Sequence, residues 1–167
     1  MIGLVLSAMI VIALYVGAMA YVSKQIPESI SQTVFLLPRK GQWAFTIVMW
    51  LVGFLLLPVL LEKVSEQTQF LAFLMVAGIG FVGAAPLVAK EKNTIHYVFA
   101  AIAGIASQLL VALNQPLLLL TWFLYIGYTL VAKDVSRNLF WVEVLCMLNI
   151  FALCLICGSV AGGLTRQ

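Results

Sequence analysis

Long apolar segments alternate with short polar breaks along the whole chain. The apolar residues form continuous runs rather than alternating one by one, which predicts helices rather than strands. Each run is close to the length of about 20 residues that a helix needs to cross a membrane. We therefore expect an all-α polytopic bundle of six transmembrane helices, at residues 2–22, 43–61, 70–89, 95–113, 116–132 and 139–161.

The fifth segment is the shortest, and only Asn114 and Gln115 separate it from the fourth. Two arrangements are open: a tight helical hairpin, or a single bent unit that re-enters the same side of the membrane. We favour the hairpin, because Pro116 then occupies a first helical turn, where a missing backbone N–H costs nothing.

Composition supports a membrane location. Of the 167 residues, 64% are hydrophobic and 9% are charged, whereas soluble domains are about 45–50% apolar and about 25% charged. The chain is therefore expected to form one transmembrane domain over residues 1–167. The net charge of +3 is spread over several loops, and no basic run could follow a phosphate backbone, so nucleic acid is not an expected partner.

The distribution of basic residues predicts the orientation, because cytoplasmic loops are enriched in Lys and Arg. Seven of the nine basic residues fall in the first, third and fifth loops: Lys24, Arg39, Lys40, Lys90, Lys92, Lys133 and Arg137. Loops 23–42, 90–94 and 133–138 are therefore expected to be cytoplasmic, with both termini outside. The expected location is the plasma membrane of a bacterium, its inner membrane.

Three titratable residues fall at the predicted cytoplasmic end of the bundle. His96 opens the fourth helix, Glu143 lies near the start of the sixth, and Glu28 is in the long first loop. Charged and polar groups at membrane depth often mark a functional site. They could converge on one ligand-binding opening, or each could lie separately in headgroup water.

Three further residues complete the candidate ligand-binding set. Ser107 is eleven residues after His96, about three helical turns, so both lie on one helix face. Asn149 places an amide near mid-membrane, where it must find a partner inside the protein. Pro86 removes a backbone donor and frees a carbonyl near Val82, which either binds a polar ligand or accompanies a simple kink.

The first loop, residues 23–42, is long and rich in hydroxyl groups between Pro27 and Thr33. Loops longer than about 12–15 residues are often functional. We expect this loop to lie on, or dip into, the cytoplasmic interface and to cap the helix ends there. Glu28 is placed to pair with Arg39 or Lys40.

No catalytic, nucleotide-binding or metal-binding motif is present, so no catalytic residue, metal site or cofactor is expected. The first hypothesis is non-enzymatic binding or transport of a small molecule, ion or lipid. The alternative is a membrane scaffold or partner subunit. A membrane-embedded hydrolase is third, because a zinc site is usually built from several imidazoles and His96 is the only histidine. Membrane lipids are the expected partners, with a homo-oligomer or a membrane-protein partner left open.

Overall fold

Helices form every regular element of the computed structural model, which describes residues 1–88, 94–131 and 137–164. The long helices are α1 (Ile2–Ser23), α2 (Gln42–Lys63), α3 (Gln69–Val88), α4 (Thr94–Asn114) and α6 (Asn138–Leu164), with the shorter α5 (Thr121–Val131). Three 3₁₀ helices lie between them: η1 (Ser31–Leu36), η2 (Glu66–Thr68) and η3 (Pro116–Leu120). Five of the helices are long and apolar enough to cross a membrane. The expected all-α membrane bundle is confirmed.

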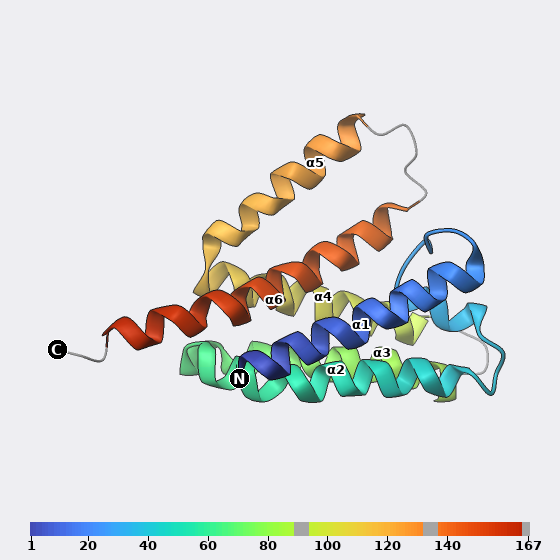
Figure 1. The fold of residues 1–167 in the computed structure, drawn as a ribbon, viewed down its shortest axis with the longest axis horizontal. Coiled ribbons are helices and arrows are strands. Elements are labelled where there is room, and N and C mark those ends of the chain that lie inside the picture. Colours follow the sequence, from blue (N-terminus) through green and yellow to red (C-terminus); the bar gives the residue numbers. More distant parts are fainter. Residues whose placement is uncertain (89–93, 132–136, 165–167) are drawn as a thin grey trace.

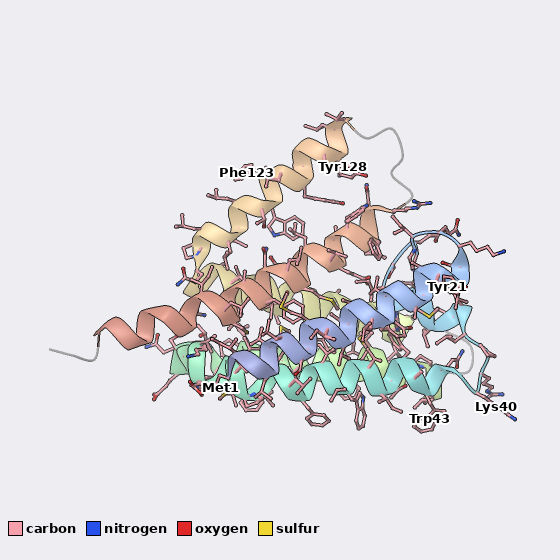
Figure 2. All side chains as sticks on the ribbon, in the orientation of Figure 1. Met1, Tyr21, Lys40, Trp43, Phe123 and Tyr128 are labelled. Carbon is pink, nitrogen blue, oxygen red and sulfur yellow. The ribbon has the colours of Figure 1, made fainter. Side chains whose placement is uncertain are left out.

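The fifth predicted segment differs from the others, because it divides into η3 and the short α5. Pro116 occupies the first turn of η3, and a residue before proline is disfavoured in helical conformation, so α4 ends at Asn114. The chain reverses direction between α4 and α5 (Figure 1), as in the predicted hairpin, and residues Pro116–Val131 are apolar but shorter than the five candidate spans. In Figure 1, α5 diverges from the rest of the bundle. None of its residues is buried, and side chains such as Phe123 are exposed (Figure 2).

Successive helices run in opposite directions when the short α5 is counted with the five long ones (Figure 1). The start of α1 and the end of α6 therefore lie toward one end of the bundle, and the connection between α1 and α2 lies at the other (Figure 1). The end with the α1–α2 connection also holds the start of α6, as the predicted up-and-down topology requires. The predicted loops at 90–94 and 133–138 lie largely outside the described residues, as do Lys90, Lys92 and Lys133.

Glycines allow α3 to lie against its two neighbours. A Cβ added at Gly78 would lie 2.9 Å from the Cβ of Ala103 in α4, and one at Gly83 would lie 2.9 Å from the Cβ of Met49 in α2. Thr46 donates its hydroxyl to the Gly83 carbonyl at 2.7 Å. Small residues and such hydrogen bonds are the usual means of helix association within lipid.

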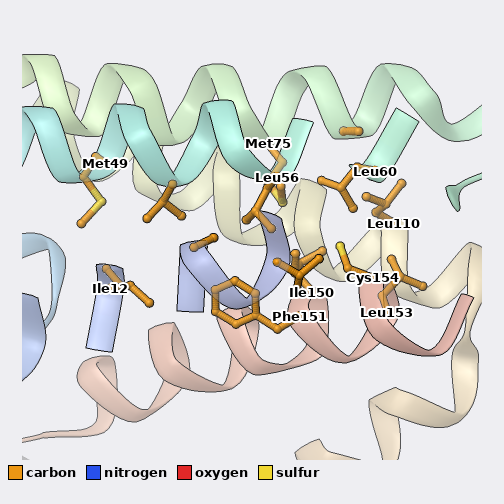
Figure 3. Close-up of a cluster of buried hydrophobic side chains, with 14 of the residues drawn as sticks. Ile12, Met49, Leu56, Leu60, Met75, Leu110, Ile150, Phe151, Leu153 and Cys154 are labelled. Atoms are coloured by element: carbon orange, nitrogen blue, oxygen red, sulfur yellow. The ribbon is translucent and has the colours of Figure 1, made fainter. Parts of the chain in front are cut away.

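The apolar core fills the space that these helices share with α1 and α6. Figure 3 shows side chains from α1, α2, α3, α4 and α6 meeting there, among them Ile12, Met49, Met75, Leu110 and Phe151. These side chains are at most 6% exposed. The packed core leaves one face of α6, toward α4, less completely filled, and the candidate site lies there.

Candidate functional site

A cavity of about 460 Å³ lies between α4 and α6 and extends inward to α2 and α3. Its wall is mainly apolar, with side chains that include Met49, Val52, Leu56, Met75, Ile79, Ile105, Leu139, Met147, Ile150 and Phe151. The polar groups of the wall come from few positions: Ser31, Tyr97, Ser107, Gln108, Trp122, Glu143 and Cys146. Ligand sites commonly combine such an apolar wall with a small number of placed polar groups.

The cavity reaches the side of the bundle. Its inner wall holds Met75 and Phe151, which are 2% and 5% exposed, while its outer wall holds Ile105, which is 62% exposed. The exposed part belongs to the apolar surface of two helices that are long enough to cross a membrane. In a bilayer the opening therefore faces lipid rather than water.

The cavity is elongated along the helix axes. On α4 it runs from Tyr97 to Gln108, and on α6 from Leu139 to Phe151. At a rise of about 1.5 Å per residue, the α4 wall is about 16 Å long. This is roughly half of the hydrocarbon core, which is about 30 Å thick.

The carboxylate of Glu143 lies at the end of the cavity nearest the first loop. Ser29 donates its hydroxyl within 2.9 Å of both carboxylate oxygens, and Ser31 donates its hydroxyl to Oε1 at 2.6 Å. The backbone N–H groups of Ile30 and Ser31 both donate to Oε2. Ser29 and Ser31 are buried. Two hydroxyls and two backbone N–H groups thus converge on this one side chain.

The local path of the first loop explains this arrangement. The chain turns into η1 at Ile30, so two successive N–H groups point toward one oxygen, as in other anion-binding backbone turns. The N–H of Phe140 in α6 donates to the Glu28 carbonyl at 3.0 Å. Gln32 donates its amide to the Tyr97 hydroxyl at 3.1 Å. The loop is thereby joined to both helices that border the cavity.

The amide of Gln108 and the indole of Trp122 lie at the opposite end of the cavity. The Oε1 atom of Gln108 accepts from the indole N–H of Trp122 and from the amide of Asn149, each at 3.0 Å. Gln108 donates to the Ser107 hydroxyl at 3.1 Å, and Thr121 donates to Asn149 Oδ1 at 3.0 Å. These groups satisfy one another, and the network connects α4, α5 and α6.

His96 lies outside the cavity wall and is 2% exposed. Its ring is 5.8 Å from the ring centres of Phe35 and Tyr97, and 6.5 Å from that of Phe45. The Val82 carbonyl lies near the ring, but neither imidazole nitrogen makes a well-formed hydrogen bond to a described residue. Pro86, within α3, is the reason that the Val82 carbonyl lacks its helical partner.

The structure therefore places the predicted site residues in different surroundings. Glu143 and Ser107 line the cavity, whereas Glu28, Pro86, His96 and Asn149 do not. The Glu28 side chain is exposed. Within the described ranges the ion pair is Glu62 with Lys63, so Glu28 pairs there with neither Arg39 nor Lys40.

Several residues of the site were not expected from the sequence. Ser29 and Ser31 belong to the hydroxyl-rich stretch of the first loop, but no spacing in the sequence pairs them with Glu143. The contact of Trp122 with Gln108 could not be predicted from the sequence, because it depends on the sharp turn between α4 and η3. In the described part of the chain, no group of three or more His, Cys, Asp or Glu side chains is placed to hold a metal ion.

Comparisons with protein-family models, with curated proteins and with solved structures give no match to this chain.

Proposed function

We propose that this chain binds a membrane amphiphile in the cavity between α4 and α6, and that it does so without catalysis. The observation that carries the proposal is the sideways opening of an apolar cavity at membrane depth, with polar groups at its ends. A molecule already dissolved in the bilayer can enter through such an opening without crossing water.

The size of the cavity supports this class of ligand. A volume of about 460 Å³ falls within the range of about 300–1,000 Å³ for small-molecule sites. Its length of about 16 Å along α4 is close to the depth of one leaflet of the hydrocarbon core. An amphiphile with its headgroup beside Glu143 would extend its chain toward Gln108.

Binding is favoured over transport or hydrolysis by the way the polar groups are used. Ser31 with Glu143 closes one end of the cavity, and Gln108 with Trp122 closes the other, so no polar path crosses the bundle there. The hydroxyls of Ser29 and Ser31 donate to a carboxylate rather than to an imidazole. A serine nucleophile needs a base positioned to accept its proton, which is usually histidine.

Photocrosslinking tests the proposal directly. The protein is reconstituted in phosphatidylcholine vesicles with a hexadecanol that carries a diazirine on its chain, and the adducts are mapped by mass spectrometry. We expect adducts on interior wall residues such as Met75, Met147 and Phe151 as well as on lipid-facing residues. Adducts confined to outward-facing residues such as Phe123 and Leu124 would show that the cavity takes up no chain and would overturn the proposal.

We also propose that the chain resides in a bacterial plasma membrane with both termini outside. The supporting observation is that Lys24, Arg39 and Lys40 follow α1 and Arg137 precedes α6. Both segments belong to the end of the bundle opposite the start of α1 (Figure 1), and positive residues favour the cytoplasmic side. A membrane-impermeant maleimide tests this on a cysteine-free background. Cysteine placed at Glu66 should react in intact cells, and cysteine placed at Lys40 only after permeabilisation. The reverse pattern would contradict the orientation.

A further inference from the structure

We infer that the amphiphile bound in this cavity carries a positively charged amine headgroup, held beside Glu143. The inference rests on the proposed function, because it concerns the ligand of the same cavity. It follows from the charge, the hydrogen bonds and the aromatic group found at that end.

The charge of the cavity wall has one sign. Among the described wall residues, Glu143 alone is formally charged, and none of them is Lys, Arg or His. Within the described residues, no cation lies within ion-pair distance of the Glu143 carboxylate. A carboxylate beside an apolar space, where the effective dielectric constant is low, attracts a cation and repels an anion far more strongly than it would in water.

The carboxylate is also fixed in position. The backbone N–H groups of Ile30 and Ser31 both donate to Oε2. A backbone N–H can only be a donor, so the carboxylate oxygen is the acceptor in both hydrogen bonds. The two serine hydroxyls donate their protons to the same carboxylate. The carboxylate is therefore held at one place, and no cation of the described residues forms an ion pair with it.

A further acceptor for an ammonium group lies next to this carboxylate. Ser31 lines the cavity, and its hydroxyl oxygen keeps lone pairs after donating its proton. The Tyr97 side chain lines the same end, where Gln32 links it to η1. An aromatic ring and a carboxylate in the wall of one cavity are a combination that favours cationic amines. A phosphate or carboxylate headgroup would find no complementary charge there.

A competition series with one alkyl chain and three headgroups tests the inference in the unmodified protein. Hexadecylamine, hexadecanol and palmitate compete with the photoactivatable hexadecanol at pH 7, where an alkylamine is protonated. A charge-assisted hydrogen bond is stronger than a neutral one, so hexadecylamine should displace the interior adducts at a membrane concentration at least roughly tenfold lower than hexadecanol. Palmitate should be the weakest competitor.

The outcomes separate this inference from the proposed function. Equal competition by all three compounds would retain the cavity as a binding site and overturn the amine headgroup. Absence of interior adducts at the start would overturn the proposed function itself. Stronger competition by palmitate than by hexadecylamine would also overturn the inference.

The Glu143→Gln variant identifies the source of the preference, with Glu62→Gln as the matched control. Glu62 is exposed and pairs with its neighbour Lys63, away from the cavity. We expect the preference for hexadecylamine to fall to within about twofold in Glu143→Gln and to persist in Glu62→Gln. An unchanged preference in Glu143→Gln would show that it arises elsewhere. If Glu143→Gln does not fold, the headgroup series in the unmodified protein still decides the inference.

Discussion

The hydroxyl of Ser31 donates a hydrogen bond of 2.6 Å to the carboxylate of Glu143, across a separation of 112 residues in the sequence. This contact joins the first loop to the sixth helix at one end of the cavity. A charge near the start of a membrane-spanning helix thus has a defined partner inside the protein. The same contact positions the loop that closes the cavity.

Replacement of Glu143 by alanine should destabilise the protein by about 2–4 kcal/mol. Two backbone N–H groups and two buried hydroxyls lose their acceptor, and leaving such a group unpaired costs about 1–3 kcal/mol before the loop relaxes. The free energy of unfolding is measured in mixed micelles with increasing sodium dodecyl sulfate. Glu62→Ala, an exposed site, should change it by less than about 0.5 kcal/mol. Equal effects of the two substitutions would refute the role given to Glu143.

Two glycines of α3 should respond in opposite ways to alanine. A Cβ at Gly78 would lie 2.9 Å from the Ala103 Cβ and 3.0 Å from the Phe99 carbonyl oxygen, whereas a Cβ at Gly80 meets nothing within 4 Å. Gly78→Ala should therefore separate α3 from α4 and destabilise the protein by about 1–3 kcal/mol. Gly80→Ala should be neutral or stabilise it by up to about 1 kcal/mol.

The same micelle titration measures this pair. Each variant serves as the control for the other, since the two positions are separated by a single residue on one helix. If Gly80→Ala lowered the free energy of unfolding as much as Gly78→Ala, the close approach of α3 to α4 would not be the cause of the destabilisation.

His96→Phe should leave stability unchanged or raise it by about 1 kcal/mol. Both imidazole nitrogens are buried without a well-formed hydrogen bond to a described residue, and such atoms lose their hydration without compensation. A phenyl ring fits among Phe35, Phe45 and Tyr97. Tyr15→Phe is the matched control, because the Tyr15 hydroxyl bonds Thr33 at 2.7 Å and its removal should cost about 0.5–1.5 kcal/mol. If His96→Phe lowered the free energy of unfolding by more than about 2 kcal/mol, the imidazole would have a polar partner and the expectation would be wrong.

The sequence was sufficient to predict the helical bundle, because a continuous apolar run of membrane-spanning length can form few structures other than a transmembrane helix. The position of Pro116 also predicted the hairpin between α4 and the following segment. That segment divides into η3 and α5, and α5 diverges from the bundle. Both features depend on tertiary packing, which cannot be inferred from the pattern of apolar residues.

Less of the candidate site than of the fold could be predicted from the sequence. Glu143 could be selected because a charge within an apolar segment needs a compensating environment. Its partners Ser29 and Ser31 could not be paired with it, because their distance depends on the path of a loop that precedes it by more than a hundred residues. The separation of His96 from the cavity likewise depends on how its side chain packs among three aromatic rings.

The most direct test of the central claim is to fill the cavity from within. Gly104 lines the cavity, and a Cβ there meets nothing within 4 Å, so Gly104→Phe places a ring in the space without displacing backbone. Gly17→Phe is the control, at an exposed glycine of α1 that is equally unobstructed and lies outside the cavity wall. With the photoactivatable hexadecanol, Gly104→Phe should lose at least about nine-tenths of the interior adducts, a tenfold change in occupancy, and keep those on lipid-facing residues. Gly17→Phe should keep both. Interior adducts that persist unchanged in Gly104→Phe would contradict binding of an amphiphile in this cavity.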